Sequence, residues 1–294
     1  MSTFLLLAVT GLGLAALYFL IASGLSLIFG LMGVLNFAHG AFLSIGAYGT
    51  WWAAEHLPGA GSDGFGFVLS VLFGVVVGAV FAVLVELVLI RPLYNRHIEQ
   101  VLVTVGLSLA TVALIRAIFG ADALPFPRPA IAAQTTEILG ARIPNDRFLL
   151  IGAALVVLVA VLGFLRFTRF GLIIRAGVEN RAMVTALGID VRKSFTLVFA
   201  IGGAAAALAG ALGGVYLGSI SPGQGTSLLI FAFIVVVIGG LGSLTGAAVA
   251  SVVVGLVQQF ANFYAATGVG DFSVVLLLAV ILLVRPGGLS SRLA

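Results

Sequence analysis

From Met1 to Ala54 the chain carries no formally charged side chain. An apolar stretch of this length has room for two membrane spans of about 20 residues each. The composition of the whole chain agrees, because 62% of its 294 residues are hydrophobic and only 8% are charged, whereas soluble domains carry about 25% charged residues. The sequence therefore predicts a polytopic integral membrane protein.

Hydropathy divides the chain into nine apolar segments, which predict an all-α protein with about 8–9 transmembrane helices in a single transmembrane domain, residues 1–294. The first segment lacks the basic n-region of a cleavable signal peptide, so we expect it to remain as a mature helix. The nine segments are 4–28, 34–54, 66–90, 98–119, 148–165, 193–217, 227–241, 244–261 and 271–285.

Basic residues in short loops predict the orientation of these segments. Arg91 and Arg96 follow the third segment, a basic loop at 166–193 follows the fifth, and Arg285 and Arg292 follow the last. The positive-inside rule places all three regions in the cytoplasm, with the N-terminus outside. For the last basic region to be cytoplasmic, the number of membrane crossings must be odd. The chain must then cross the membrane twice between the sixth segment and the last, with a break at the glycine-rich run Gly239-Gly240-Leu241-Gly242-Ser243.

The connection at 120–147 then lies outside the cytoplasm. Its four prolines predict an ordered structure, since each fixes one backbone angle. Two arrangements are open for it: a ledge that receives an external partner, or a lid packed on the chain's own helices.

The cytoplasmic loop at 166–193 holds six basic side chains and two acidic ones, an excess equal to the net charge of +4 of the whole chain. Residues 179–187 are expected to form a short helix that ends before Gly188, with an apolar face that needs a partner because so short a helix is marginal alone. A solvated loop that only sets topology is the alternative. The candidate contacts to a cytoplasmic partner are Arg175, Glu179, Asn180, Ala182, Met183, Ala186, Leu187 and Gly188.

Polar side chains at membrane depth are the candidates for a solute pathway, because an unpaired polar group there is costly. The glycines around Asn36 and His39 favour a broken helix whose free amides meet a polar ligand; a purely structural role, in which the two side chains cap or bridge helices, is equally open. The tentative pathway residues are Asn36, His39, Thr104, Ser108, Gly240 and Ser243.

The sequence contains no phosphate-binding loop of the form G-x-x-x-x-G-K-[ST], no G-x-S-x-G elbow and no H-E-x-x-H pair. It also has no cysteine. We therefore expect no catalytic residues, no metal ligands and no cofactor bound by this chain, and a transport role would need a motor in another subunit.

Five blocks of sequence, spread over nearly the whole chain, resemble the permease subunits of ATP-binding-cassette (ABC) importers for branched-chain amino acids, the Liv type. Each block is modest alone, but their order is specific. The blocks are Leu25-Ser26-Leu27-Ile28-Phe29-Gly30 with Asn36-Phe37-Ala38-His39-Gly40 and Gly46-Ala47-Tyr48; Glu86, Arg91-Pro92-Leu93 and Thr104 with Gly106-Leu107-Ser108; Arg175-Ala176, Glu179-Asn180 and Ala186-Leu187-Gly188; Gly239 to Ser243 with Gly246; and Arg285-Pro286-Gly287-Gly288-Leu289.

The resemblance implies the shorter permease subunit of a bacterial inner-membrane importer, driven by ATP through alternating access. It implies four kinds of partner: a second homologous permease, two ATP-binding subunits that hold ATP and Mg²⁺, a periplasmic substrate-binding protein and the lipid bilayer, with no nucleic acid. One position departs from the family, because Ala41 stands where many members carry an acid after the NFAHG run. That departure leaves open branched-chain amino acids, other small amino acids, urea or short amides. A stand-alone facilitator or ion-coupled carrier is the alternative function, and a non-transporting scaffold a third.

Overall fold

The computed structural model describes residues 2–33, 36–59, 64–94, 96–188, 191–266 and 268–289. Helices form most of this structure, with four short strands in two antiparallel pairs, β1 with β4 and β2 with β3. In chain order the elements are α1 (Ser2–Met32), α2 (His39–His56), α3 (Gly64–Val85), the π-helical turn η1 (Glu86–Ile90), the 3-10 turn η2 (Arg91–Leu93), α4 (His97–Phe119), β1 (Leu124–Pro125), α5 (Ala130–Ala133), β2 (Thr135–Ile138), β3 (Ala141–Pro144), α6 (Asn145–Phe167), α7 (Arg169–Ala186), α8 (Val191–Leu217), β4 (Ser219–Ile220), α9 (Gln224–Gly239), α10 (Leu244–Tyr264) and α11 (Val269–Val284).

Each of the nine apolar segments predicted from the sequence covers most of one α-helix of the described structure, which confirms an all-α polytopic membrane protein. Six of these helices are long and apolar enough to cross a membrane: α1, α3, α4, α6, α8 and α10. Helices α9 and α11 have 16 residues each, about 24 Å of rise against a hydrocarbon core of about 30 Å. Neither of these two helices is long enough to cross the hydrocarbon core completely.

The predicted break between the segments at 227–241 and 244–261 is confirmed. Helix α9 ends at Gly239, and Gly240 and Gly242 follow with φ of +96° and +81°, backbone angles that favour glycine. Ser243 then starts α10, because its hydroxyl accepts a hydrogen bond from the N–H of Gly246 at 3.0 Å. Glycine geometry and a serine cap together end α9 and start α10 here.

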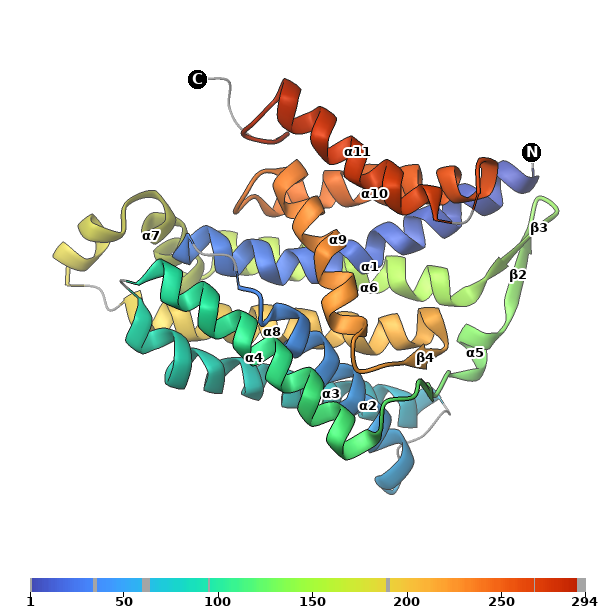
Figure 1. Cartoon of the computed structure of the whole chain (residues 1–294), viewed down its shortest axis with the longest axis horizontal. Helices are drawn as coiled ribbons and strands as arrows, with labels where there is room; N and C mark the ends of the chain where they lie inside the picture. The colour runs from blue at the N-terminus through green and yellow to red at the C-terminus, as the bar shows by residue number, and fades with distance from the viewer. Residues whose placement is uncertain are drawn as a thin grey trace.

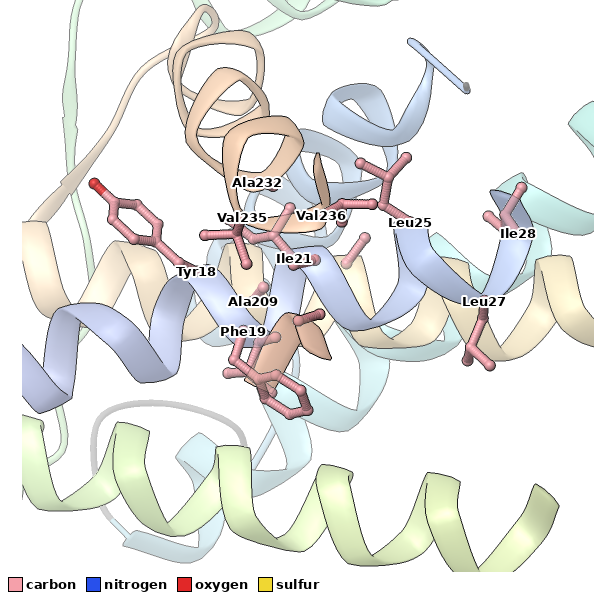
Figure 2. Packing of buried hydrophobic residues seen from close by; sticks show 14 of the residues in the cluster. Tyr18, Phe19, Ile21, Leu25, Leu27, Ile28, Ala209, Ala232, Val235 and Val236 are labelled. Carbon is pink, nitrogen blue, oxygen red and sulfur yellow. The ribbon is translucent and has the colours of Figure 1, made fainter. Parts of the chain in front are cut away.

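Helix α1 is the centre of the molecule, and Leu20, Ile21, Ala22 and Leu25 in its middle are fully buried. It packs against α6, α8, α9 and α10. Figure 2 shows the arrangement, with the side chains of α1 meeting those of Ala232, Val235 and Val236 on α9. An α1 that is apolar on all sides is expected for a helix surrounded by other helices.

Helices α2, α3 and α8 approach one another at glycines, which lack a side chain and so let two backbones come close. A Cβ at Gly46 of α2 would overlap the backbone of Ala207 of α8, and one at Gly210 would overlap the carbonyl of Leu43. A Cβ at Gly74 of α3 would lie 2.5 Å from the oxygen of Gly46. Main-chain contact between helices thus replaces side-chain interdigitation in this part of the fold.

The two ends of the molecule differ (Figure 1). Helix α7 and the turn between α3 and α4 lie at one end, and the N-terminus and the β2–β3 hairpin lie at the other. These two ends hold the loops that the sequence assigned to the cytoplasm and the periplasm.

The connection at 120–147 is ordered, and its two halves differ. The first half packs on the chain's own helices: β1 pairs with β4, the ring of Phe126 is buried against Gly214, and the indole N–H of Trp51 donates to the carbonyl of Pro125 at 3.1 Å. The second half forms the β2–β3 hairpin, and Leu139 at its turn is 87% exposed. Strand β2 and the turn at Leu139 are therefore open to an external partner, whereas Ala141 and Ile143 of β3 are buried and β3 packs on α1.

Candidate functional site

The break between α1 and α2 brings polar residues into the interior. His39, the first residue of α2, is fully buried, and its Nε2 lies 3.0 Å from the carbonyl oxygen of Ile21. A carbonyl only accepts, so Nε2 carries the proton and donates it. Ile21 stands about 16 Å along the axis from the end of α1 at Met32, given a rise of 1.5 Å per residue. Helix α2 thus begins deep in the protein rather than at a surface.

Asn36 has a local structural role, since its Oδ1 accepts from the N–H of Ala38 at 3.0 Å. Its Nδ2 and the Nδ1 of His39 are buried without a hydrogen-bond partner among the described residues. Each side chain therefore uses one polar atom to hold the broken helix and keeps a second one unpaired. The structural and the ligand-binding interpretations of these residues are compatible.

The N-terminal ends of α2 and α9 meet beside this break. A Cβ placed at Gly40 of α2 would lie 2.8 Å from the oxygen of Gly225 in α9, so the two backbones touch. The N-terminus of a helix carries a partial positive charge, although here the N–H groups of His39, Ala41 and Phe42 in α2 already donate to carbonyls of the break. Two such ends converging in an apolar interior favour a negatively charged group nearby, as at the broken helices of transporters.

Thr104 and Ser108 lie elsewhere, on the buried face of α4 together with Gln100 and Thr111. The hydroxyls of Thr104 and Thr111 donate to carbonyls of their own helix, at 3.0 and 2.8 Å. This face of α4 is thus a stripe of small polar residues at helical spacing, and the structure supports a packing role for Thr104.

Gly240 and Ser243 belong to the turn between α9 and α10. A Cβ at Gly30, near the end of α1, would lie 3.2 Å from the Cα of Gly242 in this turn. Gly288, near the C-terminus, also packs on the turn, since a Cβ there would lie 2.7 Å from the backbone nitrogen of Gly240. The six predicted pathway residues therefore occupy three places: the α1–α2 break, the buried face of α4, and the α9–α10 turn.

A cavity of about 540 Å³ opens where the end of α1, the α9–α10 turn, α6 and α7 meet. The hydroxyl of Ser26 on its wall is buried and has no hydrogen-bond partner among the described residues. Sequence reasoning missed Ser26 as a pathway residue, although its hydroxyl lies inside an apolar run, and it assigned Arg175 to the partner surface alone. The residues around the cavity are Ser26, Leu27, Gly30, Leu165, Leu172, Ile174, Arg175, Ala176 and Gly242.

Helix α7 begins at Arg169, ten residues before the predicted start at Glu179, so the expected short helix is wrong in its length. The cause is Gly171, which lets α7 contact α6 closely: a Cβ there would lie 2.6 Å from the Cα and the oxygen of Leu165. The first half of the helix is held by this contact. The second half ends as predicted, with Gly188 at φ of +79°.

The two sides of α7 differ in burial. Ile174 and Val184 are 3% and 5% exposed, so that side packs on the chain itself. Met183 and Leu187 are 63% and 70% exposed, and Ala186 is exposed beside them. The side chains of Glu179, Asn180 and Ala182, also predicted as contacts, lie outside the described residues. The exposed group Met183, Ala186 and Leu187 is called the α7 surface below.

Among the described residues, no group of three or more His, Cys, Asp or Glu side chains is arranged to hold a metal ion.

Comparison with known proteins identifies the family. The family model "Branched-chain amino acid transport system / permease component" matches residues 7–285. The branched-chain amino acid permease BraD of Pseudomonas aeruginosa is 30% identical over 290 residues, which cover 97% of this chain and 94% of the relative.

Two LivH proteins are also similar. That of Escherichia coli K12 is 29% identical, over 96% of this chain and 94% of its own length. The probable LivH of Methanocaldococcus jannaschii is 27% identical, over 92% and 87%. No solved structure matches the chain. The match over nearly all of its length shows that this chain is a member of the permease components of branched-chain amino acid ABC transport systems.

Proposed function

We propose that this chain forms one half of the membrane path of an importer for branched-chain amino acids, and that an ATP-binding subunit binds it at the α7 surface. The exposure of Met183, Ala186 and Leu187 supports this proposal. An exposed apolar patch at the end of a helix in a cytoplasmic loop marks a site where a partner docks.

The partners follow from the family. A homologous permease would complete the path, and two ATP-binding subunits would supply the energy, because the sequence has no phosphate-binding loop of its own. Closure of those subunits would pull α7, and through Gly171 the end of α6. A periplasmic substrate-binding protein would meet the exposed β2–β3 hairpin at the opposite end of the molecule.

A zwitterionic substrate needs a positive or donor group for its carboxylate, an acceptor such as a neutral imidazole nitrogen for its ammonium group, and an apolar wall. The converging N-termini of α2 and α9 favour a carboxylate, and the unpaired atoms of Asn36 and His39 lie at the same break. Farther toward the cytoplasm, Arg175 and the hydroxyl of Ser26 line the cavity of about 540 Å³, whose other walls include Leu27, Leu165 and Ile174. Such walls suit an aliphatic side chain.

The proposal is tested by a substitution that introduces a charged side chain on the α7 surface. Ala186→Asp should abolish uptake of leucine, isoleucine and valine in cells while the protein still inserts in the membrane, because an acid would be buried without a partner when the ATP-binding subunit docks. Ala186→Ser is the matched control, of nearly the same size and without charge, and should retain most of the uptake. Wild-type uptake by an inserted Ala186→Asp variant would refute the docking role of α7.

A further inference from the structure

A second cavity, of about 560 Å³, lies at the cytoplasmic ends of α3 and α8, outside the proposed path. Two cations, Arg91 and Lys193, line it, and both are exposed. No ion pair of either is recorded within the described part of the chain. The remaining lining residues are Val83, Phe170, Thr196, Leu197 and Ala200.

The lining of this cavity changes with depth in the membrane, from charged side chains at the cytoplasmic end to apolar ones farther in. Arg91 stands eight residues beyond Val83 on α3, η1 and η2, about 12 Å of helical rise, and Ala200 stands seven beyond Lys193 on α8, about 10 Å. The two helices run in opposite directions, so both cations lie at the cytoplasmic end and the apolar side chains lie deeper. A phospholipid has the same order, with its phosphate at the surface and its acyl chains below.

The nearby acid does not neutralise the two cations by direct pairing. Glu86 is fully buried in the π-helical turn, and its carboxylate accepts hydrogen bonds from the hydroxyls of Tyr94 and Thr196, the latter at 2.8 Å. Thr196 also lines the cavity. The carboxylate is thus held by two hydroxyls in the wall between α3 and α8. The guanidinium of Arg91 and the ammonium of Lys193 can therefore interact with a ligand in the cavity.

The surface next to the cavity suits acyl chains. Val80, Leu84 and Val88 of the α3 region are between 52% and 65% exposed, and Phe170 at the start of α7 is 46% exposed. Val80 lies deeper in α3 than the lining residue Val83, whereas Leu84 and Val88 lie between Val83 and Arg91, so exposed apolar side chains accompany this helix from below Val83 up to the cations. We propose that this cavity binds the headgroup of an anionic phospholipid of the cytoplasmic leaflet, with its phosphate between Arg91 and Lys193. Basic pockets between helices on this side of a membrane favour such lipids.

The experiment is native mass spectrometry of the full-length chain, purified in mild detergent and titrated with phosphatidylglycerol or phosphatidylcholine. Wild type should retain phosphatidylglycerol in preference to phosphatidylcholine. The double variant Arg91→Gln with Lys193→Gln should bind phosphatidylglycerol roughly 30-fold more weakly, about fivefold for each lost cation. The matched control is Arg166→Gln with Arg169→Gln, which removes two exposed cations from the same side but outside the cavity, and it should bind as wild type does.

Three results would overturn the proposal. The first is equal retention of phosphatidylglycerol by wild type and the double variant. The second is an equal loss in the control, which would mean that only the general charge of the surface matters. The third is displacement of the lipid by glycerol 3-phosphate at similar concentration, since the site would then bind the free anion. For a double variant that fails to fold, Leu197→Trp fills the apolar half instead and should weaken retention while keeping both cations.

Discussion

The Nε2 atom of His39 lies 3.0 Å from the carbonyl oxygen of Ile21, and this hydrogen bond ties the start of α2 to the middle of α1. Both residues are fully buried, and a Cβ at Gly24, one turn farther along α1, would lie 2.8 Å from the Cε1 of His39. The bond therefore fixes how deeply the broken helix enters the protein, and the position of Asn36 depends on it.

A change of His39 to Phe removes both ring nitrogens, and two measurements then test the structural and the transport role of the ring. His39→Phe keeps an aromatic ring but loses the donor to Ile21, so we expect a loss of about 1 kcal/mol in the free energy of unfolding. It also removes the unpaired Nδ1, and uptake of leucine should fall roughly tenfold, the value of about one hydrogen bond. Chemical unfolding in detergent and uptake in cells measure the two effects. A stability loss with unchanged uptake would leave His39 a structural residue only.

Glycine packing predicts a contrast between two alanine substitutions. Gly46→Ala should destabilise the protein by about 1–3 kcal/mol, because its Cβ would overlap the backbone of Ala207 and the helices must separate. Gly106→Ala, on α4, should be neutral or slightly stabilising, because no described atom lies within 4 Å of its Cβ position. Thermal unfolding in detergent compares them, and equal melting temperatures would contradict the close contact of α2 with α8.

A chain of hydrogen bonds ties α1, α10 and α11 together. The hydroxyl of Tyr18 donates to Oε1 of Gln258 at 2.8 Å, and Nε2 of Gln258 donates to Oδ1 of Asp271 at 2.7 Å. Gln258→Leu should cost about 1–3 kcal/mol of stability, because it leaves the buried hydroxyl of Tyr18 unpaired. Adding Tyr18→Phe should recover part of that loss. A double-mutant cycle measures this coupling, and strictly additive effects would show that the pair does not interact.

The orientation of the chain is open to chemical labelling, because the protein has no cysteine. Leu139→Cys in the hairpin and Leu187→Cys on the α7 surface each introduce a single thiol at an exposed position. A membrane-impermeant maleimide added to spheroplasts should label the first and not the second. Labelling of Leu187→Cys from outside would reverse the predicted topology.

The sequence predicted well whatever depends on local composition. Hydropathy located the nine helices that lie in apolar segments. The glycine-rich run at 239–243 identified the turn between α9 and α10, because glycine is favoured where φ is positive. Features that depend on tertiary contacts were not predictable. Nothing near His39 indicates that its ring reaches Ile21, and the early start of α7 depends on Gly171 meeting Leu165.

The candidate site was predictable only in part, for the same reason. Asn36 and His39 stood out as polar residues in an apolar stretch, and they do lie at a broken helix. Ser26 and Arg175 were not recognised as neighbours, since they are brought together by the packing of α7 against α1. Conversely, Thr104 was singled out for its polarity alone, and its hydroxyl is satisfied within α4.

The most direct test of the central claim is co-purification of the tagged chain from its native membrane in mild detergent, with wild type, Ala186→Asp and Ala186→Ser in parallel. We predict that wild type and Ala186→Ser recover a second permease and two ATP-binding subunits. Ala186→Asp should recover the second permease without the ATP-binding subunits, because the acid lies on the α7 surface and away from the helices buried in the membrane. Recovery of the wild-type chain alone, in a form that transports amino acids into vesicles without ATP, would contradict the account.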